Sequence, residues 1–284
     1  MSGGELARRV TAIAGSNVRK QSPLSGGTFG ALTRFALADG SDLVAKTAVG
    51  ASTLALEGWM LEYLATHTAL PVPDVLYADD TLLLMTYLPA GDAVGGTAET
   101  HAAELIAALH DVRGDRFGLE RDTVIGPLVQ PNDRSTAWIP FLRDRRLMFM
   151  GRQAYEAGHL DGETLSRLEA FCARLDAYIE EPEFPSLLHG DLWTGNVLAK
   201  DGRISGFIDP AIYFGDPEMD LAFSTLFGTF GDAFFARYTD IRPLYADFFE
   251  ERRDICNLWP ILVHARLFGG QYGSQAGEIL KRFV

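Results

Sequence analysis

Cysteine is scarce in this chain of 284 residues. The two that occur, Cys172 and Cys256, lie in different segments and match neither a metal site nor a disulfide framework. No apolar run approaches the length of a membrane span, and residues 1–15 contain no apolar core of signal-peptide length. These absences lead us to expect a soluble cytoplasmic protein with reduced thiols and no membrane partner.

Positive charge is scarce as well. Lys and Arg number 25 against 38 Asp and Glu, so the net charge is −13. This balance argues against nucleic acid or an anionic membrane surface as a partner. The composition, with 47% hydrophobic and 22% charged residues, is that of an ordinary globular protein of one large or two modest domains. The sequence leaves the oligomeric state open.

The first part of the chain combines strand patterns with one helical pattern. Residues 22–46 predict three strands, separated by a glycine-rich turn and by an Asp-Gly hairpin turn. A helix is expected over Ser52–Thr66, with the serine as its N-cap. Residues 75–88 predict a second hairpin. We therefore expect residues 1–88 to form a small lobe with an antiparallel sheet and one helix.

From residue 89 onward the pattern becomes helical. Residues 98–110 and 165–179 repeat apolar side chains at helical spacing, and the last seventy residues, rich in Phe and Leu, suggest packed helices. We expect residues 89–284 to form a larger, mainly helical lobe. The predicted fold class is α+β, with two lobes joined near Leu88.

The segment LLHGDLWTGNVL, residues 187–198, places Asp191 and Asn196 in otherwise apolar surroundings. Burying an ionised Asp without a partner costs several kcal/mol or shifts its pKa. Asp, Asn and Gly are also ordinary turn residues, so a capped turn is one explanation of the segment. The residues that follow decide between a turn and a functional site.

Strand patterns on either side of residues 201–202 predict a hairpin with an Asp-Gly turn. In the simplest register Asn196 faces Phe207, and Asp209 lies two residues further along the same strand. Asn196 and Asp209 then reach the same end of the hairpin, with Asp191 on the loop just before it. The sequence thus predicts three oxygen-bearing side chains at one hairpin mouth.

Such a group suits a site for magnesium and phosphate, because Mg²⁺ takes one or two protein oxygens and fills its other positions with water and phosphate. The spacing His-x-Asp-x-x-x-x-Asn, followed by a further Asp, is typical of the kinase catalytic loop. On this interpretation Asp191 accepts or orients the proton of the attacking hydroxyl, while Asn196 and Asp209 hold the metal. Three unrelated turn residues are the alternative.

Glu57 interrupts the apolar stripe of the helix expected over residues 52–66, so it should have a buried cationic partner. Lys46, at the end of the preceding strand, is the nearest candidate. The sequence LVAK resembles the strand lysine that in kinases pairs with a helix glutamate and with phosphates; a surface salt bridge is the alternative. Upstream, Gly26 and Gly27 belong to a glycine-rich stretch that could lay backbone N–H groups over phosphates.

Together these motifs resemble those of the fructosamine kinases (ketosamine-3-kinases), a family of the aminoglycoside-phosphotransferase and protein-kinase-like superfamily. The resemblance runs from about Ser25 to Tyr272. His-Gly-Asp followed by Asn marks only the superfamily, and the Leu192-Trp193 pair narrows it to the family. The segments that carry the resemblance are HGDLWTGN, IDPAIYFGDPEMDLAF, HARLFGGQY and the stretch over residues 117–147.

The resemblance implies a protein-kinase-like two-lobed fold with ATP and Mg²⁺ between the lobes. Residues 1–88 would then be the nucleotide-binding lobe, and residues 89–284 the lobe for catalysis and substrate binding. The resemblance further implies transfer of the γ-phosphoryl group to the sugar 3-hydroxyl of a ketosamine, in deglycation. Whether that ketosamine is fructosyl or ribulosyl, small or protein-bound, stays open. A related kinase of an aminoglycoside, choline or another amine-bearing alcohol is the first alternative, and a catalytically dead nucleotide-binding protein is the second.

The resemblance also implies roles for single residues. Asp191 becomes the catalytic base, and Trp193 borders the sugar-amine pocket with His264, although either side chain could serve packing alone. His189 is expected to hold the loop by hydrogen bonds, and Thr194 stands where many relatives have serine or glycine. The other implied roles are magnesium binding by Asn196 and Asp209, a phosphate clamp of Lys46 and Glu57 beneath the loop of Gly26 and Gly27, adenine binding by Met85, Thr86, Tyr87 and Leu88, and structural anchoring by Asp216, Glu218 and Asp220.

Overall fold

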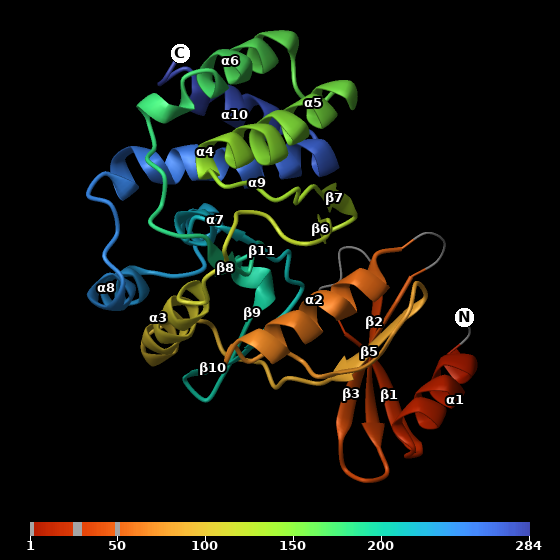
Figure 1. The fold of residues 1–284 in the computed structure, drawn as a ribbon. Coiled ribbons are helices and arrows are strands. Elements are labelled where there is room, and N and C mark those ends of the chain that lie inside the picture. Colours follow the sequence, from red (N-terminus) through yellow and green to blue (C-terminus); the bar gives the residue numbers. More distant parts are fainter. Residues whose placement is uncertain (1–2, 25–29, 49–51) are drawn as a thin grey trace.

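The computed structural model describes residues 3–24, 30–48 and 52–284. Its first part is a five-stranded antiparallel sheet in the order β1-β2-β3-β5-β4, accompanied by two helices (Figure 1). The expected Gly26 and Gly27 loop lies outside the described residues. The elements are α1 (Gly3–Ala14), β1 (Val18–Leu24), β2 (Ala31–Leu37), β3 (Asp42–Thr47), α2 (Leu54–His67), β4 (Val75–Ala78) and β5 (Leu82–Thr86).

Strand β5 shows why each face of the sheet has its own helix. Successive side chains of a strand point to opposite faces. Leu82 and Leu84 pack in one buried cluster with Val10 of α1, whereas Leu83 packs in a second cluster with Leu54 of α2. Helix α1 is absent from the sequence expectations, which place one helix in this lobe; it adds the cover for the second face.

Helix α2 confirms the helix expected over residues 52–66 but begins at Leu54, with Thr53 at its N-cap position. The predicted cap, Ser52, lies one residue earlier, and its hydroxyl accepts the backbone N–H of Leu54 at 3.3 Å. The same hydroxyl donates a 2.6 Å hydrogen bond to the carbonyl oxygen of Asp80, in the β4–β5 turn. This bond ties the start of α2 to the hairpin beneath it.

The second part of the chain is mainly helical, as expected, and the boundary at residue 88 stays a prediction. Its central helix α9 packs against α5, α7 and α10. The expected helix over 165–179 is shorter, because α6 ends at Cys172 and a separate 3₁₀ turn follows. The helices are α3 (Thr97–His110), α4 (Trp138–Phe141), the π-helix η1 (Leu142–Leu147), α5 (Met148–Glu156), α6 (Gly162–Cys172), η2 (Leu175–Ala177), η3 (Thr194–Asn196), α7 (Glu218–Leu226), α8 (Asp232–Ile241), η4 (Phe248–Arg252), α9 (Arg253–Phe268) and α10 (Gln271–Leu280).

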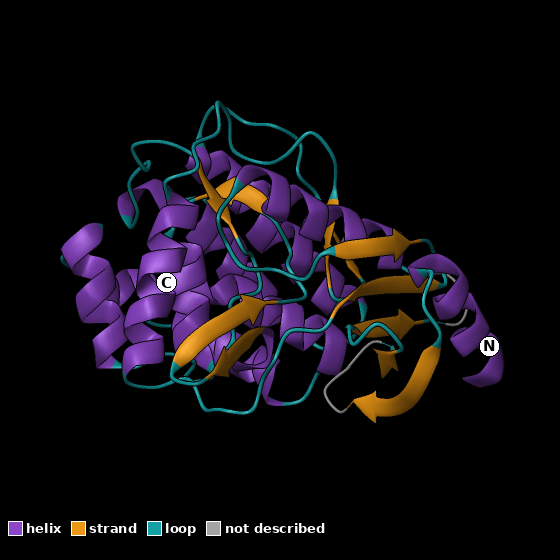
Figure 2. Cartoon of the chain, turned by 90° about the horizontal axis from the view of Figure 1, so that it is seen from below, coloured by secondary structure: helices purple, strands orange, loops and turns teal. Residues whose placement is uncertain are grey.

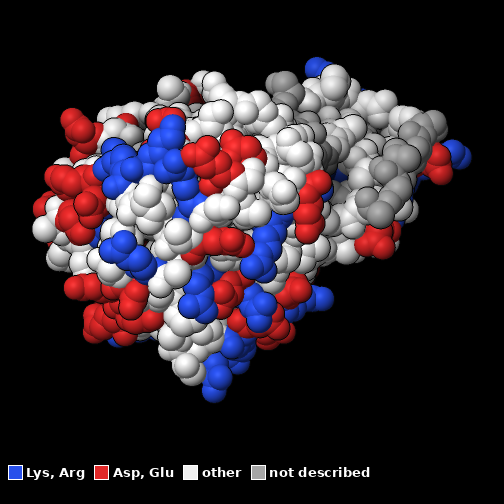
Figure 3. All heavy atoms as spheres, turned by 90° about the horizontal axis from the view of Figure 1, so that it is seen from above, with Lys and Arg blue, Asp and Glu red and all other residues white. Residues whose placement is uncertain are grey.

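Three two-stranded sheets complete this lobe: β6 (Thr123–Ile125) with β7 (Leu128–Gln130), β8 (Ser186–Leu188) with β11 (Tyr213–Gly215), and β9 (Val197–Lys200) with β10 (Arg203–Phe207). The view in Figure 2 shows the five-stranded sheet at one end of the molecule and most of the helices at the other. On the face drawn in Figure 3, charged side chains of both signs are interspersed over the helical lobe. No helix among the described residues is long and apolar enough to cross a membrane.

The hairpin β9–β10 corrects one part of the predicted register. Its turn pairs Lys200 with Arg203, but a bulge before Gly206 shifts the remaining pairs by one residue. The backbone N–H of Ile208 consequently donates to the carbonyl oxygen of Asn196 at 3.0 Å, so the predicted facing of Asn196 and Phe207 is wrong. Gly206, just after the bulge, lets Leu88 pack against the strand, because a β-carbon there would collide with the Leu88 side chain.

Candidate active site

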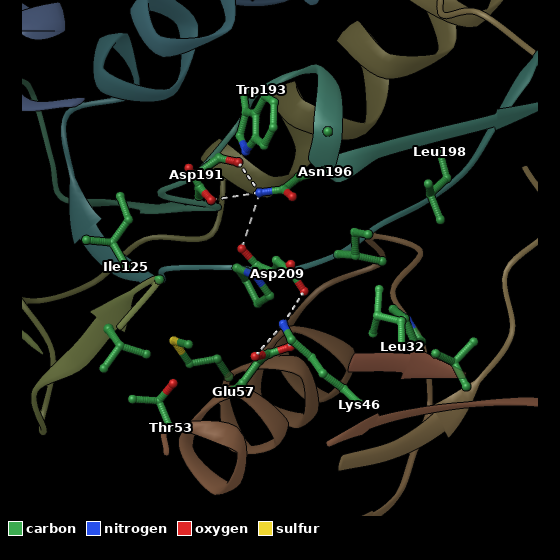
Figure 4. Close-up of a pocket in the computed structure, with 18 of the residues that line it drawn as sticks. Leu32, Lys46, Thr53, Glu57, Ile125, Asp191, Trp193, Asn196, Leu198 and Asp209 are labelled. Atoms are coloured by element: carbon green, nitrogen blue, oxygen red, sulfur yellow. Dashed lines mark hydrogen bonds and ion pairs between the residues drawn. The ribbon is translucent and has the colours of Figure 1, made fainter. Parts of the chain in front are cut away.

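A pocket of about 520 Å³ lies between the sheet and the helical lobe. Figure 4 shows Lys46 and Glu57 on one side, Asp191 and Asn196 on the other, and Asp209 between them. All predicted site residues within the described part of the chain line this pocket, namely Lys46, Glu57, Met85, Thr86, Tyr87, Leu88, Asp191, Trp193, Asn196, Asp209 and His264.

Lys46 and Glu57 form the buried pair that the interrupted apolar stripe predicts. The ammonium of Lys46 donates to both carboxylate oxygens of Glu57 at 2.8 Å and to Oδ1 of Asp209 at 3.1 Å. Burial lowers the pKa of Lys46, but the two carboxylates outweigh this effect and raise it. For Glu57 the effect of burial has the opposite sign, because burial disfavours the charged carboxylate and so raises its pKa. We treat the pair as ionised, because both carboxylate oxygens accept from the same ammonium group.

Asp191 and Asn196 meet across the short helix η3. The amide nitrogen of Asn196 donates to Oδ2 of Asp191 at 2.8 Å and to the backbone carbonyl of Asp191 at 2.9 Å. The carboxamide oxygen of Asn196 therefore points away from this carboxylate (Figure 4). Burial raises the pKa of Asp191 to about 7, although the hydrogen bond from Asn196 opposes the shift. A carboxylate with such a pKa suits general-base chemistry near neutral pH.

Asp209 follows strand β10 rather than lying in it. Its φ of 51° is in the left-handed region, where residues other than glycine are uncommon. The side chain is 40% exposed and meets Lys46 across the pocket. The bulge and this turn, rather than a continuous strand, bring Asp209 beside Asn196, whose amide nitrogen lies 3.5 Å from the Asp209 carbonyl oxygen.

The turn before Asp191 is anchored from below by Asp220 of α7. Its carboxylate accepts hydrogen bonds from the backbone N–H groups of His189 and Gly190 at 2.7 and 2.8 Å. The imidazole Nδ1 of His189 accepts from the backbone N–H of Asp191 at 3.3 Å, and burial lowers the pKa of this histidine. His189 thus holds the loop as a neutral ring.

Two further acidic residues expected to be structural, Asp216 and Glu218, are also buried beside a cation. The guanidinium of Arg252 donates to Glu218 at 2.5 Å and lies 3.5 Å from Asp216. Neither of these residues lines the pocket. The described residues contain no group of three or more His, Cys, Asp or Glu suited to a metal ion.

The pocket has two apolar ends. At the end next to the sheet, the expected segment from Met85 to Leu88 faces Leu198 and Ile208, and Leu32 closes it from β2. An apolar slot beside a strand and its connector is a suitable place for a flat heterocycle.

The other end of the pocket is aromatic. The rings of Trp193 and Phe227 lie 5.6 Å apart, those of Phe227 and His264 5.2 Å, and those of His264 and Tyr272 5.0 Å. The imidazole Nδ1 of His264 lies 2.8 Å from the carbonyl oxygen of Pro260, one helical turn before it, and burial lowers the pKa of the ring. Phe227, Phe268 and Tyr272 are pocket residues that the sequence analysis did not single out, although two of them belong to the quoted HARLFGGQY segment.

Comparison with known proteins decides the family. The family model described as Fructosamine kinase matches residues 10–284. The chain belongs to the fructosamine kinase family. Among curated relatives it is 33% identical to a probable ketoamine kinase of Vibrio parahaemolyticus, over 81% of this chain and 80% of that protein. It is 34% identical to a probable ketoamine kinase of Escherichia coli, over 80% and 79%.

Solved structures agree. A putative fructosamine-3-kinase from Thermobifida fusca superposes with a TM-score of 0.89 at 30% identity, over 99% of this chain and 98% of that one. One from Haemophilus somnus gives 0.84 at 27% identity, over 98% and 96%. An aminoglycoside phosphotransferase gives 0.66 at 17% identity over 97% of each chain, which shows a shared fold alone.

Membership in the fructosamine kinase family confirms the expected class of protein. The protein is an enzyme, a phosphotransferase whose acceptor is a sugar hydroxyl. The expected α+β, two-lobed, kinase-like fold is confirmed as well. The aminoglycoside phosphotransferase, which represents the first alternative, shares with this chain the fold alone.

Proposed function

We propose that this fructosamine kinase transfers the γ-phosphoryl group of ATP to the 3-hydroxyl of a fructosamine or ribulosamine, in deglycation in the cytoplasm. The observation that carries the proposal is the meeting of Asp191, Asn196 and Asp209 with the Lys46–Glu57 pair at one pocket. The ketoamine kinase relatives, which match about four fifths of the chain, support the choice of acceptor.

Asp191 is the base in this proposal. Its carboxylate lies in the pocket, and a pKa of about 7 leaves it able to take a proton from a hydroxyl near neutral pH. Asn196 fixes the carboxylate through its amide nitrogen. Because phosphoryl transfer needs little covalent chemistry from the protein, Asp191 acts mainly by orienting the acceptor hydroxyl.

The residues present fit a magnesium ion. The carboxamide oxygen of Asn196 and the carboxylate of Asp209 are hard oxygen donors from neighbouring residues that both line the pocket, and two protein oxygens are what Mg²⁺ commonly takes. When bound, the ion would neutralise charge on the nucleotide phosphates. We assign Asn196 and Asp209 to hold it, while Asp216, Glu218 and Asp220 are occupied elsewhere by Arg252 and by backbone N–H groups.

The nucleotide would lie with its base in the apolar slot of Met85, Thr86, Tyr87 and Leu88. Lys46, oriented by Glu57, would contact the phosphates, as lysines at this place in kinase sheets do. We assign Gly26 and Gly27 to cover the phosphates on the basis of the sequence pattern alone.

The ketosamine would occupy the aromatic end of the pocket. Its amine is cationic, and faces of Trp and Tyr attract cations. Trp193 is the ring nearest to Asp191 along the chain, so we assign it to the sugar-amine junction, with His264 further along the same wall. A neutral His264 with Nδ1 bound to Pro260 has Nε2 available as a hydrogen-bond acceptor.

Turnover of Mg-ATP with ribulosyl-lysine, fructosyl-lysine, choline and kanamycin tests the proposed acceptor. We expect phosphorylation of at least one ketosamine and none of choline or kanamycin. Turnover confined to kanamycin or choline would leave the fold and nucleotide site standing and reject the ketosamine as acceptor.

A further inference from the structure

A buried polar cluster that the proposed mechanism does not use lies beneath the loop of Asp209. It consists of Thr123 and Gln130, which face each other in the β6–β7 hairpin, with Asn132 and Arg146. All four side chains are fully buried. Polar groups are costly to bury unless they are hydrogen-bonded, so a cluster of this size needs a reason.

The hydroxyl of Thr123 is the centre of the cluster. It donates to the carbonyl oxygen of Ile212 at 3.1 Å. It also accepts from the side-chain amide nitrogens of Gln130 at 2.9 Å and Asn132 at 2.8 Å. One donor and two acceptor sites are all that a hydroxyl has, so every site is used.

Gln130 extends the cluster by one residue along the same loop. Its amide nitrogen donates a second hydrogen bond, 2.9 Å long, to the carbonyl oxygen of Ala211. Two consecutive carbonyls, those of Ala211 and Ile212, are thus held from the hairpin. They follow Asp209 and Pro210 directly in the chain.

The opposite side of this loop is held by the turn that precedes Asp191. The backbone N–H of Ala211 donates to the carbonyl of His189 at 2.8 Å. Gly190 packs so closely on the Ala211 carbonyl that a β-carbon would collide with it, and its φ is 80°. Ala211 is therefore clamped between the turn of the proposed base and Gln130. Such a clamp can hold Asp209 in a left-handed conformation that is unfavourable for an L-residue.

Arg146 of the π-helix η1 anchors the cluster from the far side. It makes no ion pair among the described residues; its guanidinium donates to the carbonyl of Pro131 and to Oδ1 of Asn132, both at 2.7 Å. The same group lies 4.0 Å from the ring centre of Tyr213. Because Arg146 takes the oxygen of Asn132, the nitrogen of that amide is turned toward Thr123.

The hairpin is also fixed on the side of the sheet lobe. The guanidinium of Arg121, two residues before Thr123, lies 4.7 Å from the ring centre of Trp59 on α2, the helix that carries Glu57. Val124 and Ile125 of the same hairpin line the pocket. A hairpin anchored at both sides can transmit its position to the loop that it holds.

We propose that Thr123 is a positioning residue for the nucleotide site, whose hydroxyl, together with Gln130, keeps the loop of Asp209 in the conformation that faces the pocket. The inference rests on the proposed function only in taking Asp209 as a metal ligand. Partners that orient metal ligands from outside the ligand shell typically contribute 10–100-fold to metal affinity or activity.

The test compares Thr123→Val, which removes the hydroxyl with little change of shape, with Thr123→Ser, which keeps it. Val129→Thr is the matched control, because Val129 lies on the same hairpin and is 52% exposed. The affinity for a fluorescent ATP analogue is measured with and without Mg²⁺. We expect Thr123→Val to reduce the gain in affinity that Mg²⁺ provides by roughly tenfold, with metal-free binding unchanged, and Thr123→Ser and Val129→Thr to retain the wild-type gain.

A folded Thr123→Val protein with the full Mg²⁺ gain would overturn the proposal, and so would an equal loss of metal-free binding, which indicates general damage. If Thr123→Val fails to fold, Gln130→Met is the second variant: it removes the bonds to Ala211 and to the Thr123 hydroxyl but leaves the bond from Thr123 to Ile212. It should show the same pattern to a smaller degree, and a folded Gln130→Met with the full gain would then overturn the proposal. These measurements need no acceptor, so a failure to phosphorylate ketosamines would reject the proposed substrate without touching this inference.

Discussion

The indole of Trp193 lies so close over Gly195 that a β-carbon on this glycine would be 2.5 Å from Cζ2 of the ring. Gly195 therefore has a steric role in the HGDLWTGN segment, because only a residue without a β-carbon lets the indole pack against the loop. Trp193 in turn meets Phe227 at 5.6 Å, at the start of the aromatic wall. The position of the ring at the acceptor end of the pocket thus depends on a residue next to the proposed metal ligand Asn196.

Replacing Gly195 with Ala should displace the indole and weaken binding of the ketosamine. We expect its KM to rise by roughly two- to thirtyfold, corresponding to about 0.5–2 kcal/mol of cation–π interaction, while the KM for ATP stays unchanged. Steady-state kinetics with fructosyl- or ribulosyl-lysine measure both values. The same substitution in a Trp193→Ala background should add nothing to the ketosamine KM. A further rise there would show that the β-carbon acts on the loop itself rather than through the ring.

Removing the carboxylate of Asp209 should remove the effect of Mg²⁺ on nucleotide binding. In Asp209→Ala we expect the Kd of Mg-ATP to rise to the metal-free value, because Asn196 alone offers a single oxygen. Asp201→Ala is the matched control, since Asp201 also has a left-handed φ, of 52°, but its side chain is 87% exposed at the hairpin turn. Titration calorimetry with and without Mg²⁺ makes the comparison. Unchanged affinity of Asp209→Ala for Mg-ATP would refute the ligand assignment.

Acid should weaken the sheet lobe through Asp79, which closes the β4–β5 turn. Burial opposes ionisation of this carboxyl, but hydrogen bonds from Thr81, Tyr77 and Arg9 prevail and hold its pKa below the usual value. Because the folded pKa is lower than the unfolded one, the stabilisation is present above the unfolded pKa of about 3.9 and is lost as the pH falls through the folded value.

Asp79→Asn should accordingly lower the free energy of unfolding by about 1 kcal/mol at pH 7, where the charged acceptor of the backbone N–H groups of Thr81 and Leu82 is lost. The difference from wild type should shrink below pH 4. Urea denaturation at a series of pH values measures it. Asp80→Asn, at the neighbouring exposed position, is the control and should have little effect; an equal loss there would trace the effect to net charge.

Where local pattern and chemistry agree, the sequence predicted the site well. Glu57 lies within an apolar helical stripe, which predicted a cationic partner, and the ammonium nitrogen of Lys46 lies 2.8 Å from its carboxylate. The Asp-Gly turn predicted the β9–β10 hairpin, whose mouth carries Asn196. Both inferences concern neighbours within about a dozen residues, for which periodicity and turn chemistry are sufficient.

What the sequence could not supply depends on contacts between distant segments. The strand beside the bulge packs at Gly206 against Leu88, and the loop of the left-handed Asp209 is bonded at Ala211 to Gln130. Phe227 follows α7 and His264 lies on α9, so their ring contact in the aromatic end of the pocket depends on the packing of these two helices. The local sequence of neither segment predicts this contact. Helix α1 is a different case, because the helical spacing of its buried side chains, Leu6 and Val10, is present in the sequence itself.

The most direct test of the whole account is phosphorylation of a ketosamine by Mg-ATP with wild-type protein and Asp191→Asn side by side, with the phosphate located by NMR. The account predicts a 3-phosphate from the wild type. It predicts turnover lower by about 10²–10⁴-fold in the variant, the usual cost of losing a general base, with ATP affinity retained. Comparable turnover in Asp191→Asn would remove Asp191 from its role, and a wild type that phosphorylates no ketosamine would contradict the proposed function.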